Sequence, residues 1–600
     1  MADFRLRARA LAAVAGAAFR ADAWSATAVF LMAILSQAAI PVMSLATGWL
    51  TDGIVAGSDA AAYRAVGVLV ALVLGTQLTG MLSFPMRMIL RERTQHVLDI
   101  RLIEMGAGMA GLEHFERPDY ADKLLLLRQQ SGLLAGAVDA VVWNVAILVN
   151  LLTTSWLLFR LDPVLGLVPI AGIPLGLAFS RDARQWEKRN EALAEEYRVA
   201  AHLAAVSTRA DAGKEIRVFG LRRELPERWR RLRGGIDRVQ QRGHLQSAAV
   251  IAAAGVFFAG VSMVAISVLL GRLASGRSGV GDLVVAVGLA GQVRGLVAGL
   301  GNMSSWLIRT TKAAERFVWF RDLAAAERVR LTPPEPAPAP AHIADGIHLE
   351  SVTFRYPGTD RDVLRDVDLR FPAGSTVAIV GDNGAGKSTL VKLLARYYEP
   401  TEGRITVDGI DLARIPIDDW RAVSSAGFQD FARFELIAAE SVGVGDLAHV
   451  DDEVAIGQAL DRAAAEQVVE ELPGGLNSML GRSFEGGVEI SGGQWQKLAL
   501  GRAMMRPAPL LLLMDEPTAA LDAATEHAQL DRYMAAGRIA ARETGAITVL
   551  VSHRFSTVRT ADLIVVVGDH GVIETGTHAE LMAGAGVYAE LYELQARSYR

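Results

Sequence analysis

The first half of the chain contains long stretches without any charged side chain, and these constrain the fold more than any other feature. Each is close to or above the roughly 18–20 residues that a helix needs to cross a hydrocarbon core about 30 Å thick. They are residues 26–50, 65–86, 140–159, 163–180 and 245–271. A sixth candidate, 283–308, is interrupted only by Arg294. Helices in soluble cores rarely run this long without charge, so the sequence predicts six transmembrane helices.

The distribution of lysine and arginine predicts how these helices are oriented. The segments before the first run and at 91–132 and 181–244 are rich in arginine, whereas the connections 51–62 and 160–162 are poor in basic residues. Alternation of this kind predicts six spans with both termini in the cytoplasm, as in a bacterial inner membrane. Arg272 and Arg277, in the connection between the fifth and sixth spans, run against the pattern. The first run is too long for the apolar core of a cleavable signal peptide, so none is expected.

Composition excludes several classes of protein. Hydrophobic residues make up 51% of the chain and charged residues 21%, which excludes an intrinsically disordered chain. The net charge of −5 carries no basic footprint, so no nucleic-acid partner is expected. The chain has no cysteine, which excludes thiolate metal sites and a cysteine nucleophile.

A change in sequence pattern near residue 331 predicts a domain boundary. Residues 331–341 read LTPPEPAPAPA, a composition typical of an extended linker. Beyond it, short β-branched runs alternate with helical stretches, as in an α/β domain. We therefore expect a six-helix transmembrane domain over 1–330 with long cytoplasmic helical extensions, a Pro/Ala-rich linker over 331–345 and an α/β domain over 346–600.

A phosphate-binding loop is the clearest motif of the α/β domain. Residues 377–380 (VAIV) read as a buried strand and lead into a loop and a helical stretch. The loop matches GxxxxGK[ST], whose glycines let backbone N–H groups surround phosphate oxygens at a helix N-terminus. Its members are Gly381, Asp382, Asn383, Gly384, Ala385, Gly386, Lys387, Ser388 and Thr389. Lys387 is expected to reach the β- and γ-phosphates, and the Ser388 hydroxyl to ligate Mg²⁺.

A second buried strand is expected to end at the same site. Residues 510–514 (LLLLM) form a continuous apolar run, as in a central parallel strand, and are followed by Asp515 and Glu516. Asp515 is expected to hold Mg²⁺ through water, and Glu516 to orient or deprotonate the attacking water.

Together these segments resemble the ATP-binding cassette (ABC) transporter family over essentially the whole chain. The sequence ISGGQ, with Ser491, Gly492, Gly493 and Gln494, resembles the family signature LSGGQ with isoleucine in place of leucine. Tyr356 resembles the aromatic residue that stacks on adenine, and Gln429 the Q-loop glutamine that reaches the metal. Asp522 resembles the D-loop aspartate, and His553 the switch histidine of catalysis. Taken singly, Tyr356 could be a half-buried strand aromatic and His553 an ordinary histidine. Their order and spacing carry the assignment.

The resemblance also implies an assembly. In the family, two cassettes pack head to tail, so each ATP lies between one phosphate loop and the signature of the other chain. One membrane half and one cassette make a half-transporter. Because Glu516 and a near-consensus signature are both present, a homodimer is favoured over a heterodimer. Segments 114–120 (HFERPDY) and 213–220 (GKEIRVFG) resemble the coupling helices of exporters, although ordinary amphipathic turns remain an alternative. Exporters commonly carry a glutamate- and glycine-rich stretch before the signature, and here GRSFEGG stands in its place, with Glu485.

The function implied is an ATP-driven exporter in a membrane, with ATP and Mg²⁺ at the cassette interfaces. The alternatives are a membrane-anchored regulatory or remodelling ATPase, and an importer with the exporter fold. The stretches GFQDFARF and SGGQWQKLALGRA resemble bacterial peptide exporters and equally drug or lipid exporters. The substrate class therefore stays open between a peptide, a drug-like molecule and a lipid-like amphiphile.

Arg294 is the only ionisable residue inside a predicted span. On a helical projection one side of this span carries Leu289, Val293, Leu296, Val297 and Leu300, and we expect that side to meet lipid. Arg294 lies within the opposite arc of small and polar residues, which includes Gln292. A charge at bilayer depth costs several kcal/mol unless it is paired or hydrated, and is a functional candidate for that reason. The sequence thus predicts that Arg294 and Gln292 line a substrate cavity. The alternatives for Arg294 are a buried ion pair with Asp139 and snorkelling of its side chain to the membrane interface.

Overall fold

The computed structural model describes residues 2–129, 131–209, 212–276, 278–516, 523–552, 558–568 and 570–598. The chain divides into two compact units. A helical unit comprises Met1–Gly106 and Lys123–Asp322, and an α/β unit comprises Ala107–Asp122 and Leu323–Arg600.

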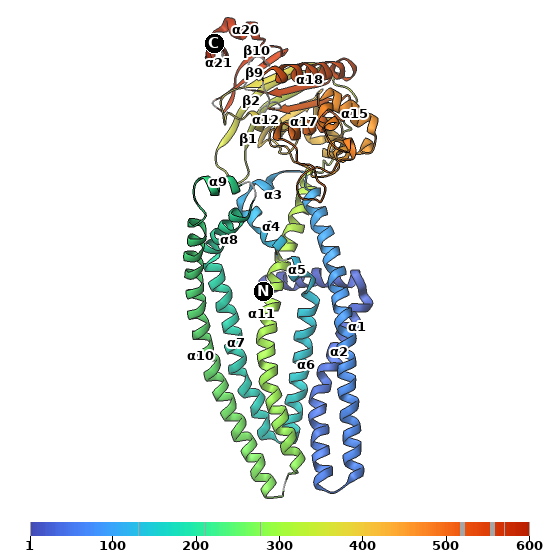
Figure 1. The fold of residues 1–600 in the computed structure, drawn as a ribbon, viewed down its shortest axis with the longest axis vertical. Coiled ribbons are helices and arrows are strands. Elements are labelled where there is room, and N and C mark those ends of the chain that lie inside the picture. The colour runs from blue at the N-terminus through green and yellow to red at the C-terminus, as the bar shows by residue number, and fades with distance from the viewer. Residues whose placement is uncertain are drawn as a thin grey trace. The chain divides into compact units, whose positions relative to one another are not determined.

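Six helices are long and apolar enough to cross a membrane, which confirms the predicted number of spans. They are α1 (Ala2–Val55), α2 (Asp59–Gly108), α6 (Ala137–Leu161), α7 (Leu167–Ala192), α10 (Glu224–Ala274) and α11 (Val280–Leu331). The shorter helices around them are α4 (Pro118–Gln129), α5 (Ser131–Ala135), η1 (Pro163–Gly166), α8 (Ala194–Thr208) and α9 (Gly213–Val218). Within the helical unit, α1 packs beside α6 and α7 packs beside α10 (Figure 1).

Helix α1 consists of two helices joined at a kink. Asp22 has non-helical backbone angles (φ −164°, ψ 91°), and its carboxylate accepts hydrogen bonds from the Ser25 backbone N–H (2.9 Å) and hydroxyl (2.8 Å). This is the bonding of a helix N-cap, so the first span begins after Asp22. Arg93 of α2 pairs with the same carboxylate at 2.6 Å and joins the two helices there.

The prediction that the apolar side of the sixth span meets lipid is wrong. Leu289, Val293 and Val297 of α11 are buried in a core that also contains residues of α6, α7 and α10. Small residues let these helices approach closely, since a Cβ at Gly301 would lie 2.4 Å from the Phe179 side chain. In this chain the larger apolar side chains pack between helices. On the opposite arc, Arg294 and its neighbours Gly291 and Gly295 are exposed.

One of the two basic residues that run against the predicted orientation forms an ion pair. Arg272, at the end of α10, pairs with Asp162, whose side chain is only 3% exposed. Asp162 also caps η1 by accepting a hydrogen bond from the Val164 N–H at 2.9 Å. The charge of Arg272 is therefore paired within the protein. Arg277 lies outside the described residues.

The α/β unit contains two sheets. The larger has the order β10-β9-β3-β8-β7-β6, with β10 antiparallel and the other pairs parallel; the smaller is antiparallel, with the order β2-β1-β4-β5. The strands are β1 (Gly346–Arg355), β2 (Asp362–Pro372), β3 (Thr376–Val380), β4 (Glu402–Val407), β5 (Ile410–Asp411), β6 (Ser424–Gly427), β7 (Leu511–Asp515), β8 (Ile547–Val551), β9 (Leu563–Gly568) and β10 (Gly571–Gly576). All residues of β3, β7 and β8 are buried, as the two apolar runs predicted for β3 and β7.

Helices of the α/β unit surround these sheets. They are α3 (Glu113–Glu116), α12 (Lys387–Leu394), α13 (Ile417–Ala422), α14 (Ala438–Gly443), α15 (Glu453–Arg462), α16 (Glu466–Glu470), α17 (Gly492–Ala503), α18 (Ala523–Thr544), α20 (His578–Gly584) and α21 (Val587–Ser598), with single turns η2 (Leu412–Arg414), η3 (Leu447–His449) and η4 (Gly475–Asn477). A six-stranded, mainly parallel sheet together with these helices confirms the predicted α/β class for this half of the chain.

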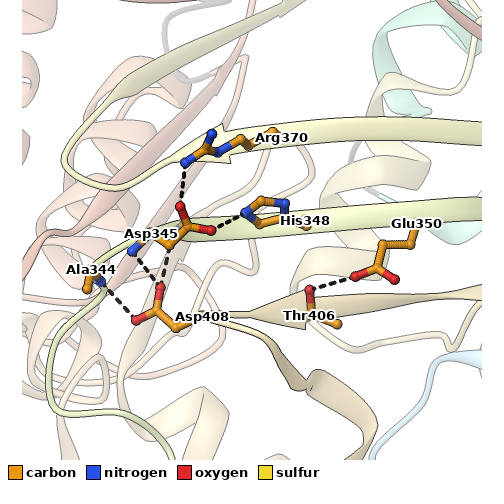
Figure 2. Close-up of polar contacts among 8 residues, drawn as sticks. Ala344, Asp345, His348, Glu350, Arg370, Thr406 and Asp408 are labelled. Carbon is orange, nitrogen blue, oxygen red and sulfur yellow. Dashed lines mark hydrogen bonds and ion pairs between the residues drawn. The ribbon is translucent and has the colours of Figure 1, made fainter.

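Asp408 fixes the point at which the chain enters the antiparallel sheet (Figure 2). It lies in the turn between β4 and β5, and its carboxylate accepts hydrogen bonds from the backbone N–H groups of Ala344 (2.8 Å), Asp345 (2.8 Å) and Gly346 (3.0 Å). Burial alone would raise the pKa of Asp408, but these three bonds outweigh it and hold the pKa below its usual value. Asp345 in turn binds Arg370 and His348, which ties the same segment to β2 and β1.

Replacing Asp408 with alanine should lower the unfolding midpoint of the cassette by about 2–4 °C. This corresponds to about 1 kcal/mol, the typical cost of losing a side-chain cap of backbone N–H groups. Because the folded-state pKa is lowered, the stabilisation should be complete above the unfolded pKa of about 4 and should disappear as the pH falls through the folded value. Scanning fluorimetry of the lipid-reconstituted chain at several pH values measures this. The exposed Asp451→Ala serves as the control, and an equal loss there would contradict the assignment.

Candidate functional site

The phosphate loop lies between the end of β3 and the start of α12. Gly381 has φ +147°, and a Cβ there would lie 2.0 Å from the Val567 carbonyl oxygen. Gly386, at the N-cap of α12, has φ +107°. Both positions therefore require glycine, which is a stronger constraint than the motif alone expresses. The loop also leads directly into the N-terminus of α12, whose first N–H groups are free to bind a phosphate held by the loop.

Lys387 places a cation inside this loop. Its side chain is 7% exposed, and Nζ donates hydrogen bonds to the carbonyl oxygens of Gly381 and Asp382, both at 2.9 Å. Burial lowers the pKa of the Lys387 ammonium, and the carboxylates of Glu516, Asp515 and Asp382 oppose this only in part. A bound phosphate would favour the charged ammonium and so offset the cost of its burial.

Two carboxylates reach the site from the end of β7. Asp515 is buried, and burial raises its pKa; the negative charge of Glu516 adds to this, whereas a hydrogen bond with Ser388 opposes it. Glu516 follows with φ +47°, a left-handed conformation that is strained for a side chain of this kind. Its carboxylate accepts a hydrogen bond from Gln429 Nε2 at 2.9 Å.

These groups meet in a cavity of about 670 Å³, a volume typical of small-molecule sites. Its lining is Tyr356, Val363, Asn383, Gly384, Gly386, Lys387, Ser388, Thr389, Gln429 and Glu516. The Tyr356 hydroxyl and Thr389 Oγ1 lie 3.0 Å apart, which fixes the aromatic ring beside the loop. The structure thus brings together the predicted aromatic residue, phosphate loop, Q-loop glutamine and catalytic carboxylate.

The donor atoms fit a magnesium nucleotide. Ser388, Gln429 and Asp515 offer the oxygen ligands that Mg²⁺ prefers, and a divalent cation would favour the ionised form of the buried Asp515. The described residues contain no cluster of three or more histidine, aspartate or glutamate side chains that could hold a metal. Sparse protein ligation is typical of Mg²⁺, which takes its remaining ligands from water and phosphates.

The signature residues do not line this cavity. Ser491 is the N-cap of α17: its hydroxyl oxygen accepts a hydrogen bond from the Gln494 N–H at 3.2 Å, and Gln494 Oε1 accepts one from the Ser491 N–H at 2.8 Å. Ser491 and Gly492 are exposed, with Gly493 partly so. This reciprocal capping orients Ser491 and uses its oxygen as an acceptor, which leaves the hydroxyl proton to donate elsewhere. Asp522 and His553 lie outside the described residues.

A second cavity, of about 830 Å³, lies in the helical unit between α7, α10 and α11. Its lining is largely apolar, and Arg294 is the only charged residue among the described residues that line it. No ion pair joins Arg294 to Asp139, both of which are described; Asp139 instead interacts electrostatically with Arg87 and Arg91. Gln292, the other nominated residue, lies outside this lining and donates a hydrogen bond to Ser44 of α1 at 2.7 Å.

Comparison with known proteins identifies the family. The family model described as "ABC transporter" matches residues 364–519. The chain is 31% identical over 458 residues to the ATP-dependent lipid A-core flippase of Bordetella avium, covering 76% of this chain and 73% of the relative. It is 34% identical over 444 residues to the flippase of the same name from Alkalilimnicola ehrlichii, covering 72% of this chain and 69% of the relative.

The chain belongs to the ABC transporter family.

Other matches agree at the level of fold. Against the ATP-dependent lipid A-core flippase of Aromatoleum aromaticum the identity is 35% over 327 residues, so the chain spans only about half the length of that relative (51%). The solved structure of a bacterial Atm1-family ABC exporter with ATP bound superposes with a TM-score of 0.77 at 22% identity, covering 95% of this chain and 99% of that one. The predicted architecture, an exporter-type membrane domain fused to an α/β cassette, is confirmed.

Sequence reasoning missed several residues that shape the transporter's sites. Val363 lines the nucleotide cavity from β2, and Glu471 accepts a hydrogen bond from Gln494 Nε2 at 3.0 Å. Neither has a motif that could have revealed it. Glu116 and Lys392 form an ion pair across 276 residues of sequence. Glu116 did fall within the predicted coupling pattern, but nothing in the sequence indicated its partner.

Proposed function

We propose that this chain is one half of a dimeric ATP-driven exporter of a lipid-like amphiphile. The observation that carries the proposal is that one chain holds both six helices able to span a membrane and a cavity lined by Lys387 and by Glu516, the residue after β7. ATP-dependent lipid A-core flippases among the relatives support a lipid-like substrate over a peptide or a drug-like molecule. A regulatory ATPase and an importer of the same fold are the competing functions.

The residues of the cavity divide the work of hydrolysis. Lys387 and the loop N–H groups would bind the phosphates, Ser388 and Asp515 would hold Mg²⁺ with Gln429, and Tyr356 would stack on the base. Bound ATP supplies the phosphoryl group whose transfer to water releases the free energy for transport. Glu516 would orient the attacking water and accept its proton, a role for which its position in the lining of the cavity is suited.

Two observations support a dimer. The Ser491 hydroxyl lies at an exposed helix N-terminus and does not line the chain's own nucleotide cavity, so a second chain is needed to place a signature there. At the end of α9, the apolar residues Val218 and Phe219 are 79% and 68% exposed, and contact with a second chain would remove this apolar surface from water. Because one chain carries both Glu516 and Ser491, two identical chains would form two complete sites, which favours a homodimer.

The membrane cavity suggests what the substrate must look like. An apolar lining suits acyl or other apolar groups, and the single cation Arg294 suits a phosphate or carboxylate. We infer that the substrate is an anionic amphiphile, carried across a bacterial inner membrane with both chain termini in the cytoplasm. Export is favoured over import by the flippases among the relatives.

Replacing Glu516 with glutamine should slow ATP hydrolysis by roughly 10²-fold or more, because the positioned base is lost, while ATP binding is retained. Steady-state ATPase assays and nucleotide titrations of the reconstituted protein separate this effect from that of Lys387→Ala, which should instead weaken nucleotide binding, since a direct phosphate contact is lost. In the same vesicles, ATP-dependent translocation of a labelled anionic lipid should disappear with Glu516→Gln. Turnover like that of the wild type in this variant would rule out the role of Glu516.

Replacing Arg294 with glutamine should raise the concentration of an anionic amphiphile that half-maximally stimulates the ATPase by about tenfold. This is the order expected for one lost charge-assisted contact. Stimulation by an uncharged amphiphile of the same chain length should change little. Arg238→Gln, on the same helical unit, is the matched control, because its side chain donates to its own helix at Gly234. An equal effect on both amphiphiles, or misfolding rescued by Asp139→Asn, would make Arg294 structural.

A further inference from the structure

A short segment far from the cassette in sequence belongs to the cassette in structure. Helix α3 and its flanks are part of the α/β unit. Arg421 Nη2 donates a hydrogen bond to the Ala110 carbonyl oxygen at 2.7 Å, and the Gly111 N–H donates to Glu327 Oε1 at 2.7 Å. His114 is buried, with 3% exposure. The start of α3 is therefore held by backbone contacts that do not depend on the nucleotide site.

At the other end of α3, the Glu116 carboxylate contacts the rest of the cassette. Glu116 Oε1 accepts a hydrogen bond from Lys392 Nζ at 2.6 Å, and Glu116 Oε2 accepts one from the Tyr398 hydroxyl. Lys392 lies on α12, the helix whose N-terminus forms part of the phosphate loop. Burial alone would lower the pKa of Lys392, but the hydrogen bond and charge of Glu116, together with the interactions with Tyr356, outweigh burial and raise the pKa. Lys392 is therefore charged at neutral pH.

The same ammonium contacts the aromatic ring proposed to stack on the base. Lys392 Nζ lies 5.3 Å from the centroid of the Tyr356 ring, within the range of a cation–π interaction. Tyr398, the second partner of Glu116, meets the Tyr356 ring edge to face with centroids 5.4 Å apart. Phe354 packs against both rings, at 5.0 Å and 5.4 Å. Both partners of Glu116 thus contact Tyr356 directly.

Tyr356 also stands between two cavities. It lines the nucleotide cavity of about 670 Å³ and a second one of about 450 Å³, whose lining includes Glu113, Glu116, Lys392 and Tyr398. Tyr356 is the only described residue common to the two linings. A group that stacks on Tyr356 therefore meets the same ring that Lys392 and Tyr398 contact, and both of these residues also bind Glu116 of α3.

We propose that Glu116 is a positioning residue that, through Lys392 and Tyr398, links stacking of the nucleotide base on Tyr356 to the position of α3. This proposal rests on the proposed function, because it requires a nucleotide in the cavity. It goes further, because it assigns the effect on α3 to the base of the nucleotide and not to its phosphates. Lys392 shares one charge between a carboxylate and a ring, so a change at the ring alters its attraction for Glu116. In a partly buried site such attractions are stronger than in water.

The test compares ADP with pyrophosphate, a ligand of the phosphate loop that has no base. Hydrogen exchange of the full-length chain in lipid reports on the N–H groups of Phe115, Glu116 and Arg117, which are bonded within α3. At saturation, ADP should slow exchange of these amides several-fold, and pyrophosphate should leave them near the ligand-free rate. Tyr356→Leu should abolish the difference between the two ligands.

The variants localise the link. Lys392→Met should remove the ADP effect on α3 and weaken ADP binding several-fold, with pyrophosphate affinity changed less than about twofold. Glu116→Gln should reduce the effect in the same direction. Glu350→Gln is the matched control, because Glu350 binds Thr406 on the antiparallel sheet (Figure 2) and also Arg404. This variant should leave the ADP effect intact.

The outcomes separate the two claims. Equal protection of α3 by pyrophosphate and ADP, or full protection in Lys392→Met, would overturn the link while leaving the proposed function standing. Binding of ADP to the wild type without any change in α3 would do the same. A wild-type chain that binds neither ligand would overturn the proposed function and the link together.

Discussion

The structure of the cassette depends on a buried cation held between backbone carbonyls and carboxylates. Lys387 is buried at the start of α12, where the carbonyl oxygens of Gly381 and Asp382 accept hydrogen bonds from its ammonium. This position exists because β3, β8 and β7 are parallel neighbours, so the loop after β3 and the carboxylates after β7 emerge at the same edge. Crevices at the carboxyl ends of parallel strands are the usual ligand sites of such sheets. Two strained or glycine-dependent positions, Gly381 and Glu516, hold the backbone there.

The same helix extends the influence of this site beyond the nucleotide. Helix α12 begins at the phosphate loop and carries Lys392 in its last turn, where it reaches Glu116 of α3 and the Tyr356 ring. This short helix therefore lies beside the expected position of the phosphates at one end. At its other end it contacts the Tyr356 ring and α3, which lies between the second and third spans in the sequence. The sequence of this segment resembles the coupling helices of exporters, and the structure shows the contacts that attach it to the cassette.

Much of this fold could be predicted from the sequence because its signals are local. Charge-free runs predicted the six helices, and VAIV and LLLLM predicted two buried strands, since a strand covered on both faces needs apolar residues throughout. The phosphate loop was found in its expected context between a strand and a helix. The grouping of Tyr356, Gln429 and Glu516 around that loop followed from motif order.

The remaining features depend on contacts between distant parts of the chain. The apolar side of α11 was assigned to lipid, but apolar side chains serve equally well between helices, and periodicity alone cannot tell the two environments apart. Gln292 shared the polar arc with Arg294 and yet binds Ser44 of α1. Two pairs form only because the fold brings distant residues together: Glu116 with Lys392, and Glu471 with Gln494. The local sequence around these residues does not predict such contacts.

The central claim is that each ATP site is completed by the signature of a second chain, and cross-linking tests it most directly. Because the natural chain has no cysteine, Asn383→Cys and Glu489→Cys can be placed singly in two differently tagged chains carrying Glu516→Gln. Position 383 lies in the phosphate loop, and 489 lies two residues before Ser491. With ATP present, we expect a disulfide that joins the two tags, and little without nucleotide. If no link forms between chains, and a chain carrying both cysteines links internally instead, the composite site is excluded.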